Sequence, residues 1–544
     1  MKTSDILVQC MKAYGITRVF AVPGEENLDF VQSLKDYGIE MIVVRNEQTA
    51  VFMAATHGRL TGEPGVALAT LGPGATNMVT GVAYAQLGGL PVIVITGQKP
   101  IKKSKQGAFQ IIDTVAMMKP ITKYAISIVD GRRIPSIFAN AYEAAIQERP
   151  GAVHLELPED IAGEDVDMDG WIATKPAKTR RPQMDNKQRD LLINTLTSAR
   201  RPLLLVGAGA NRKRVTKYLT QFVTQYNIPF FTSQMGKGVI DERLPQYIGT
   251  AGLTSNDRLH PVIATADCII AVGHDIIEKP TNLIESGKTH VIHINFTPAV
   301  IDLLYEPTMQ VIGDIGNTFW QLCEAQINTN NRDLDTIYTL SAQQREKKHT
   351  YEASLSQSGS ISLPEIIHTI RSNLADDDIV ALDNGLYKIW FARNYPTYHP
   401  NTLLLDNALA TMGAGYASAM MAKILNPDKK VIAVVGDGGL LMNLGDLATI
   451  DKLGLTMTII ILNNNSYGMI QRKQVGQDFD DWGMELKNPD FVMLAQSFGA
   501  TYADVVSDTD DFGKKLTYAL VTPGLSVLIV PIHYPLHFFP PQEG

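Results

Sequence analysis

The chain has 544 residues. A single hydrophobic core stops growing at about 250–300 residues, so we expect at least two domains. With 45% hydrophobic and 19% charged residues, the composition is that of a globular α/β protein and excludes a disordered or fibrous chain. A formal net charge of −8 argues against nucleic acid as a partner, because no surplus of positive charge is present to attract phosphates.

The amino end and the cysteines point to a cytoplasmic protein. No signal peptide is visible, and no apolar stretch approaches the ~20 residues that cross a membrane, so a membrane partner is not expected. Cys10, Cys268 and Cys323 lie far apart and form no CxxC pair. This spacing predicts free thiols and favours neither disulfides nor a zinc site.

Short apolar runs alternate with longer helical patterns along the chain. Strands are predicted at residues 41–44, 92–95, 203–206, 431–435 and 458–462. Fully apolar strands separated by helices are typical of parallel sheets that are covered on both faces. The predicted fold class is therefore α/β, with three domains whose parallel sheets are flanked by helices.

Two polar stretches, at about residues 164–187 and 328–360, interrupt this alternation and are interpreted as linkers. The blocks they separate, 1–165, 188–325 and 360–544, are each of ordinary domain size.

The strongest chemical signal lies in the third block. The strand at 431–435 ends in Gly436, Asp437, Gly438 and Gly439, and the strand at 458–462 ends in three asparagines, residues 463–465. The 27 positions between Asp437 and Asn464 fit one crossover of a parallel sheet, which brings both strand ends to the same edge.

Oxygen ligands at that edge suit Mg²⁺ bound to a diphosphate, and the candidate ligands are Asp437, Asn464 and Ser466. Gly438 and Gly439 would let the backbone approach a phosphate. A single Gly-Asp-Gly is usually only a tight turn, but the paired spacing favours the metal site.

These residues resemble a known family. Gly436-Asp437-Gly438 followed after 27 positions by Asn464 is similar to the diphosphate and magnesium motif of thiamine-diphosphate enzymes. Glu47, after the strand at 41–44, is similar in place to the family's cofactor-activating glutamate. The resemblance implies that Glu47 hydrogen-bonds to the pyrimidine ring and favours its imino form. It also implies a homo-oligomer, at least a dimer, with the active site at the interface.

Within that family the chain most resembles the acetolactate synthases, along essentially its whole length. Motifs at residues 72–77, 109–110, 120–123, 235–238, 410–413 and 464–469 carry the resemblance. It implies a pyrimidine-binding first block, a central block and a diphosphate-binding third block. Gln110 would lie near the reacting carbon of the cofactor. The other implied cofactor contacts are Gly24, Asn77, Gly385, Leu386, Tyr387, Ala410, Met412, Ser466, Tyr467, Gly468, Met469 and Ile470.

The central block contains a glycine-rich segment that raises the question whether a nucleotide such as FAD binds in addition to thiamine diphosphate. Residues 207–210 read Gly-Ala-Gly-Ala, which is not a full GxGxxG motif. Flavin-binding relatives have an arginine-bearing segment where this chain has residues 273–280, so FAD is expected to be absent. Lys473 replaces the tryptophan by which biosynthetic relatives favour 2-oxobutyrate, and this favours pyruvate as both donor and acceptor.

Three departures from the family pattern stand out: Glu25-Glu26 after Gly24, Asn46 before Glu47, and Leu386-Tyr387 after Gly385. A carboxylate near the reacting carbon would repel an anionic 2-oxo acid unless it is protonated or paired. Tyr387 could donate a hydrogen bond to a phosphate oxygen.

Three functions remain open. The favoured one is a carboligase that converts two pyruvate molecules into 2-acetolactate and CO₂. A 2-oxo acid decarboxylase that does not ligate usually carries paired site histidines, and no His-His pair occurs in this sequence. A noncatalytic cofactor-binding scaffold has no chemical need for the carboxylate of Glu47.

Overall fold

The structure is a computed structural model that describes residues 1–102, 107–175, 177, 181–251, 258–278, 284, 289–303, 305–355 and 361–534. Several of the sequence predictions include positions outside this set. Lys279 and Pro280 belong to the segment compared with flavin-binding relatives, residues 176, 178–180 and 356–360 belong to the predicted linkers, and each of the three predicted blocks also contains some of these positions.

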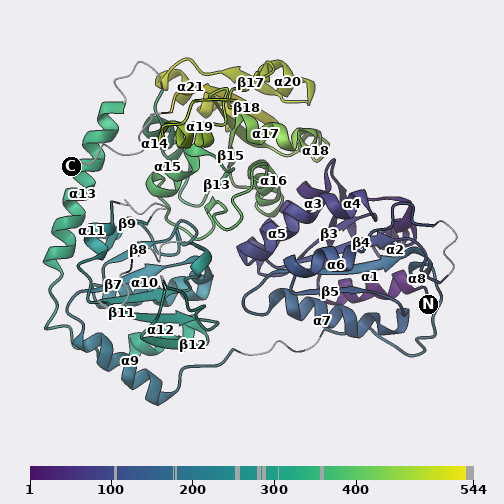
Figure 1. Cartoon of the computed structure of the whole chain (residues 1–544), viewed down its shortest axis with the longest axis horizontal. Coiled ribbons are helices and arrows are strands. Elements are labelled where there is room, and N and C mark those ends of the chain that lie inside the picture. The colour runs from purple at the N-terminus through teal and green to yellow at the C-terminus, as the bar shows by residue number, and fades with distance from the viewer. Residues whose placement is uncertain are drawn as a thin grey trace. The chain divides into compact units, whose positions relative to one another are not determined.

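Three six-stranded sheets organise the chain (Figure 1). Their strand orders are β2-β1-β3-β4-β6-β5, β12-β11-β10-β7-β8-β9 and β14-β13-β15-β16-β18-β17, and the strand pairs are parallel throughout. The predicted class, three α/β domains with parallel sheets flanked by helices, is confirmed. All five predicted strands are present, and each overlaps its predicted range.

The first sheet is most buried at its centre, where every residue of β3, β4 and β6 is buried. Its strands are β1 (Arg18–Val22), β2 (Glu40–Val43), β3 (Gly65–Ala69), β4 (Val92–Gln98), β5 (Tyr124–Ser127) and β6 (Ala152–Pro158). Its helices are α1 (Thr3–Ala13), α2 (Leu28–Asp36), α3 (Glu47–Thr61), α4 (Pro73–Asn77), α5 (Val79–Gly88), α6 (Thr114–Met118), α7 (Ile134–Ile146) and α8 (Glu159–Ala162).

The second sheet belongs to the central block. It consists of β7 (Pro202–Val206), β8 (Phe230–Thr232), β9 (Tyr247–Thr250), β10 (Cys268–Val272), β11 (His290–Asn295) and β12 (Met309–Ile312). The helices around it are α9 (Asn186–Ser198), α10 (Lys213–Gln225), α11 (His260–Ile263) and α12 (Ile315–Glu324). Most of the predicted linker at 328–360 is itself helical and forms α13 (Asp335–Leu355), which buries Ile337 and Ser341.

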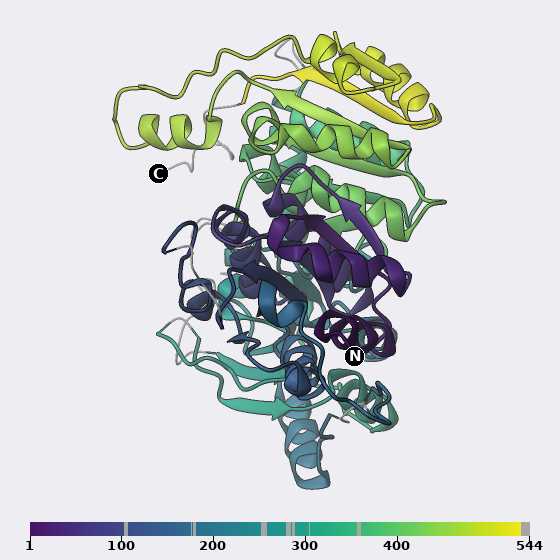
Figure 2. The ribbon, with the colours of Figure 1, turned by 90° about the vertical axis from the view of Figure 1, so that its right-hand side faces the viewer.

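The third sheet consists of β13 (Ile379–Leu382), β14 (Leu403–Leu404), β15 (Val431–Gly436), β16 (Met457–Asn463), β17 (Tyr502–Val505) and β18 (Leu525–Pro531). Its helices are α14 (Leu363–Ser372), α15 (Leu386–Asn394), α16 (Gly415–Leu425), α17 (Asp437–Met442), α18 (Leu447–Lys452), α19 (Gly468–Val475), α20 (Phe491–Ser497) and α21 (Thr509–Ala519). Figure 2 shows α19 and the segment that follows it extending away from this sheet.

The chain packs into two compact units, and neither coincides with one predicted block. The first unit consists of residues 1–179, 408–427 and 441–455, and the second of the remaining segments, 180–407, 428–440 and 456–544. Helix α16 therefore packs in the first unit, where the Thr56 hydroxyl donates to the Ser418 hydroxyl at 3.0 Å. The block boundaries 1–165, 188–325 and 360–544 stay a prediction.

The thiols of Cys10, Cys268 and Cys323 are free and buried, as predicted. Burial raises the pKa of Cys10 and of Cys268 to about 12, so these groups stay protonated. Within the described ranges, no helix has the length and apolarity that a bilayer crossing requires.

Candidate active site

Glu47 is the first residue of α3, directly after β2, as the sequence predicts. Asn46, which replaces the family's usual histidine, caps this helix: its side-chain oxygen accepts a hydrogen bond of 2.8 Å from the backbone N–H of Gln48. A helix start favours a carboxylate, because the first backbone N–H groups of the helix carry partial positive charge. Glu47 is 8% exposed, so its carboxylate is held in a defined, largely dry position.

The Glu47 carboxylate has one oxygen held and one available. Asn77, at the end of α4, donates from Nδ2 to Oε2 of Glu47 at 2.9 Å. Within the described part of the chain, Oε1 has no hydrogen-bond partner. A Cβ atom at Gly74 would lie 3.4 Å from Oε1 and 3.0 Å from the Thr70 side chain, so this glycine keeps the space beside the free oxygen open.

The two glutamates that follow Gly24 differ in their environments. Glu25 is exposed, whereas Glu26 is buried and its Oε1 lies 2.6 Å from Nζ of Lys99. The Thr70 hydroxyl donates to Oε2 of Glu26, also at 2.6 Å. Burial acts to raise the pKa of Glu26, but the hydrogen bonds from Lys99 and Thr70 outweigh it and hold this pKa below its ordinary value. Glu26 is therefore ionised and neutralised by Lys99.

Close packing also fixes the residue type at position 24. A Cβ atom at Gly24 would come within 2.5 Å of the Thr70 side chain, the same residue that binds Glu26. Only glycine fits this position without displacing Thr70.

Gln110 has a left-handed backbone, with φ of 59°, which is unusual for a residue with a Cβ atom. Gly72 packs against it closely, since a Cβ atom at Gly72 would lie 2.9 Å from the carbonyl oxygen of Gln110. The Gln110 side chain is exposed, and no hydrogen bond joins it to Glu47. Strained backbone of this kind concentrates at functional sites.

The segment with Ala410 and Met412 also lies in the first unit. Ala410 is left-handed, with φ of 56°, and Met412 is half-buried. Asn443 anchors the segment by donating from Nδ2 to the carbonyl oxygen of Gly413 at 3.0 Å. The backbone oxygen of Asn443 accepts in turn from the hydroxyl of Tyr416.

In the second unit, Tyr387 supports the start of the diphosphate motif. The backbone N–H of Gly436 donates to the Tyr387 hydroxyl at 2.9 Å, so the hydroxyl keeps its own proton for another acceptor. Burial raises the pKa of Tyr387 well above its ordinary value. A Cβ atom at Gly385 would lie 2.5 Å from the Tyr387 ring. The Leu386 side chain lies in the hydrophobic core, so only its backbone is available to a cofactor.

Four polar side chains converge at the carboxyl ends of β15 and β16. Nδ2 of Asn488 lies 2.7 Å from Oδ2 of Asp437, 2.9 Å from Oδ1 of Asn463 and 3.0 Å from Oδ1 of Asn465. An amide nitrogen carries only two hydrogens, so it cannot satisfy three oxygen atoms at once. The three oxygens therefore compete for two hydrogens and form an oxygen-rich group of the kind that hard cations prefer.

The charge of Asp437 supports the same interpretation. Asp437 is 2% exposed, and burial raises its pKa even though Asn488 and backbone N–H groups act to lower it. A buried carboxylate with a raised pKa lacks positive charge around it, which a bound cation would supply. The residues present therefore fit Mg²⁺, with Asp437 as the charged ligand. Gly438 and Gly439 lie buried in the same first turn of α17.

Asn464 and Ser466 lie in the loop between β16 and α19, and Gly468 is the first residue of α19. A Cβ atom at Gly468 would lie 2.9 Å from Nδ2 of Asn464 and 3.3 Å from the ring of Tyr534. The Ser466 hydroxyl donates to Oε1 of Gln471 at 3.0 Å. Its oxygen keeps its lone pairs, so both this oxygen and the backbone carbonyl of Ser466 are possible ligand atoms.

A second chain segment, residues 484–488, covers this loop. The backbone N–H of Leu486 donates to the carbonyl of Asn465 at 2.7 Å, and that of Tyr467 donates to the carbonyl of Met484 at 3.0 Å. The Tyr467 ring packs on Gly438, where a Cβ atom would approach within 2.7 Å. Met469 is partly buried against the core and Ile470 is 51% exposed.

Sequence reasoning missed Lys99, Asn443 and Asn488. Each acts on its partner across a large separation along the chain, 51 residues in the case of Asn488 and Asp437. No local motif surrounds these three residues, so no pattern in the sequence could have selected them.

The glycine loop after β7 is occupied by a side chain of the protein itself. The backbone N–H of Ala208 donates to Oε1 of Glu278 at 2.7 Å, and the Ser233 hydroxyl donates to the same oxygen at 3.1 Å. The other oxygen, Oε2, lies 3.3 Å from Nδ1 of His274 and would lie 2.6 Å from a Cβ atom at Gly207. The loop therefore binds an internal carboxylate at the place where a nucleotide phosphate would approach.

Comparison with known proteins agrees with this geometry. Three family models match: the N-terminal TPP binding domain of thiamine pyrophosphate enzymes at residues 1–117, their central domain at 190–322 and their C-terminal TPP binding domain at 383–530. A probable acetolactate synthase large subunit of Methanocaldococcus jannaschii is 32% identical, over 96% of this chain and 90% of its own. The chain belongs to the acetolactate synthase family of thiamine pyrophosphate enzymes.

Two further acetolactate synthases are each 30% identical. The alignment with the one from Bacillus subtilis covers 98% of this chain and 93% of the relative. The alignment with the one from Raoultella terrigena, which is described as catabolic, covers 98% of this chain and 95% of the relative. This acetolactate synthase-type chain is accordingly an enzyme with thiamine diphosphate-binding domains, and the interpretation as a noncatalytic scaffold is set aside. Glu47 lies in the segment matched by the N-terminal model, and Asp437 lies in the segment matched by the C-terminal one.

Proposed function

We propose that this enzyme is a thiamine-diphosphate- and Mg²⁺-dependent carboligase that converts two pyruvate molecules into 2-acetolactate and CO₂. The carbon–carbon bond to one carboxylate breaks, and the two-carbon unit that remains forms a bond to the carbonyl carbon of the second pyruvate. The cofactor supplies the electron sink for this step. The observation that carries the proposal is the Glu47 carboxylate, held by Asn77 with Oε1 available.

In this proposal the protein holds the cofactor at both ends. Glu47 hydrogen-bonds to the pyrimidine, and Gln110 lies near the reacting carbon. Asp437, Asn464 and Ser466 bind Mg²⁺, while Tyr387 donates to the diphosphate. The remaining contacts are Gly24, Asn77, Gly385, Leu386, Ala410, Met412, Gly436, Gly438, Gly439, Tyr467, Gly468, Met469 and Ile470.

The ion pair between Glu26 and Lys99 supports an anionic 2-oxo acid as substrate. Because Lys99 neutralises Glu26 at 2.6 Å, the two acidic residues after Gly24 add less negative charge to this region than the sequence alone indicates. Exposed Lys473 on α19, in place of a large tryptophan, supports pyruvate as acceptor as well as donor.

We further propose that the enzyme works without FAD. Glu278 already satisfies the N–H of Ala208, and a flavin diphosphate would have to displace this carboxylate and then lie near its charge. The proposed reaction involves no net oxidation or reduction, so it does not require a flavin.

A homo-oligomer, at least a dimer, is the proposed active form, with each active site shared between subunits. Large apolar side chains on and near α19 support this proposal because they are exposed: Tyr467, Ile470, Val475, Phe479 and Trp482. Exposed apolar groups of this size are typical of surfaces that another protein covers.

One product analysis tests the function. The full chain is incubated with thiamine diphosphate, Mg²⁺ and pyruvate, and acetolactate is separated from acetaldehyde. Acetolactate as the main product supports the carboligase. Acetaldehyde as the main product would show a decarboxylase that does not ligate, and absence of turnover by the purified oligomer would contradict both.

A further inference from the structure

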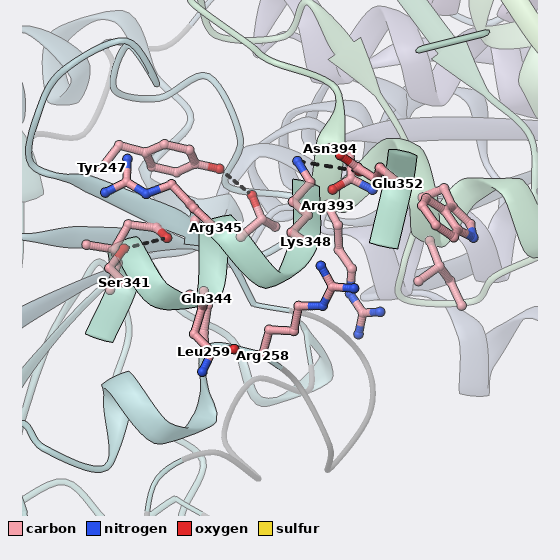
Figure 3. Close-up of a pocket in the computed structure, with 15 residues that line it drawn as sticks. Tyr247, Arg258, Leu259, Ser341, Gln344, Arg345, Lys348, Glu352, Arg393 and Asn394 are labelled. Atoms are coloured by element: carbon pink, nitrogen blue, oxygen red, sulfur yellow. Dashed lines mark hydrogen bonds and ion pairs between the residues drawn. The ribbon is translucent and has the colours of Figure 1, made fainter. Parts of the chain in front are cut away.

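The second unit contains a pocket that is lined by none of the proposed cofactor contacts. It has a volume of about 160 Å³ and is lined by residues of strand β9, by Arg258 and Leu259, by helix α13 and by the second half of α15 (Figure 3). Pockets for drug-sized ligands measure about 300–1,000 Å³, so this one suits a smaller molecule.

The charged side chains that line the pocket are mostly cationic. Arg258, Arg345, Lys348 and Arg393 carry four positive charges, and Glu352 is the single carboxylate among the lining residues. In Figure 3, Arg258 and Arg393 direct their guanidinium groups toward the same region. Such an excess of one charge in a partly enclosed space attracts ions of the opposite sign.

One of these positive charges, that of Lys348, is paired with a carboxylate of the pocket wall. Nζ of Lys348 lies 3.7 Å from Oε1 of Glu352, and these side chains are 29% and 16% exposed. Burial lowers the pKa of Lys348, and the nearby charges of Lys237 and Arg258 lower it further against the opposing effect of Glu352. Arg345 has no hydrogen bond or ion pair with any residue that the structure describes.

The rest of the pocket wall is apolar. Leu259, Ile389 and Trp390 line it, and Trp390 stacks on Tyr351 with ring centres 6.3 Å apart and planes 22° apart. An inorganic ion would leave this apolar surface uncovered. A small organic anion matches both parts of the wall, with its charged group near the cations and its apolar body on Trp390 and Ile389.

Helix α15 joins this pocket to the proposed diphosphate site. Its first turn carries Tyr387, whose hydroxyl accepts from Gly436, and its last turns carry Trp390 and Arg393 in the pocket wall. Between them, Lys388 donates to Oδ1 of Asn384 at 2.5 Å and to the carbonyl of Asp406 at 2.8 Å. A nine-residue helix spans only about 13 Å, so a ligand that fixes one end also restrains the other.

We propose that this pocket binds a small organic anion, a carboxylate or a phosphate ester with an apolar body, and that its occupancy tightens cofactor binding through α15. The binding part is independent of the proposed function, and the coupling part rests on the proposed diphosphate contacts. Coupling between two sites is reciprocal, so the cofactor tightens binding of the anion by the same factor.

Calorimetry on the full chain with thiamine diphosphate and Mg²⁺ tests the binding, with benzoate and phenyl phosphate as probes. We expect at least one probe to bind, and the preference between them distinguishes a carboxylate site from a phosphate site. The double variant Arg345→Met with Lys348→Met should weaken binding at least tenfold. Lys347→Met, on the same helix but outside the pocket wall, is the matched control and should bind as wild type does.

Failure of both probes to bind at millimolar concentration would overturn the proposal. So would equal loss of binding in the Lys347→Met control, because binding would then depend on the general charge of α13. Both variants should still form acetolactate, and this assay also checks that they are folded.

The coupling is measured by titrating the cofactor with and without the bound probe. We expect about fivefold tighter cofactor binding with the probe, and the same factor in the reciprocal titration. An unchanged cofactor Kd would overturn the coupling. Since these are binding measurements, a chain that binds and couples the probe but makes no acetolactate would contradict the proposed function alone.

Discussion

Nδ2 of Asn77 donates a hydrogen bond of 2.9 Å to Oε2 of Glu47, at the buried start of α3. This bond orients the carboxylate so that Oε1, beside Gly74, is the oxygen left for a ligand. The pair predicts how the proposed activating step responds to substitution at either residue.

Glu47→Gln should leave the cofactor bound but slow loss of the proton from its reacting carbon by about 10²–10⁴-fold, because an amide cannot supply the proton that favours the imino form. Hydrogen–deuterium exchange at that carbon in the bound cofactor measures this step. Asn77→Ala, which keeps the carboxylate but frees its orientation, should cause a smaller loss. Exchange at the wild-type rate in Glu47→Gln would remove Glu47 from the mechanism.

Lys99→Met should destabilise the fold by about 3–5 kcal/mol, because it leaves the buried Glu26 carboxylate without its cation. Urea unfolding at neutral pH measures the change. The double variant with Glu26→Gln should recover most of the loss, since no unpaired charge then remains. If the double variant is as unstable as Lys99→Met, the lysine stabilises the protein by packing and not by pairing.

The same pair predicts a pH dependence. The folded pKa of Glu26 lies below its ordinary value of 4.5, so its contribution to stability is present above pH 4.5 and is lost as the pH falls through the folded pKa. The difference in unfolding free energy between wild type and Glu26→Gln should therefore shrink below pH 4.5. A difference that stays constant with falling pH would contradict the lowered pKa.

Asp437→Asn should weaken Mg²⁺-dependent binding of thiamine diphosphate at least tenfold, because the metal loses its charged ligand while the side chain keeps its size. Calorimetry with cofactor and Mg²⁺ measures this change. Asp446→Asn, a buried aspartate that accepts from the N–H of Arg45, serves as a comparison and should leave the affinity for Mg²⁺ unchanged. Unchanged affinity in Asp437→Asn would refute the assigned metal site.

The purified protein should contain no flavin and form acetolactate at the same rate with and without added FAD. An absorbance scan and paired activity assays measure this.

Glu278→Ala should destabilise the fold by about 1–3 kcal/mol, because the N–H of Ala208 and the hydroxyl of Ser233 lose a shared acceptor. Stoichiometric flavin in the wild type would contradict the proposed role of Glu278.

The fold and the two ends of the proposed site follow from local patterns in the sequence. Apolar runs such as 203–206 and 431–435 form strands because their residues suit the interior of a parallel sheet, and the turn at Asp437 follows directly from such a strand. Local patterns do not show which side chains that are far apart in the sequence come into contact in the fold. Lys99 and Glu26 are 73 residues apart, and only the folded sheet brings them together.

Helix α13 shows a different limit. Its segment is polar and charged, with only Ile337 and Ser341 buried, so it lacks the apolar stripe that identifies most helices. The good helix formers at residues 342–348, in the middle of the segment, favour a helix all the same. The pocket beside α13 could not be predicted from the sequence either, because its cations come from three separate segments of the chain.

In the central domain, the Glu278 carboxylate would compete with any nucleotide phosphate for the glycine loop after β7. A group that belongs to the same chain as its binding loop is present there at an effective concentration on the order of millimolar, whatever the concentration of free ligands. Any nucleotide that approached the loop at Gly207 would have to compete with the Glu278 carboxylate, which is covalently attached to the same chain. A dissolved anion would therefore have to displace the Glu278 carboxylate before it could accept from the N–H of Ala208.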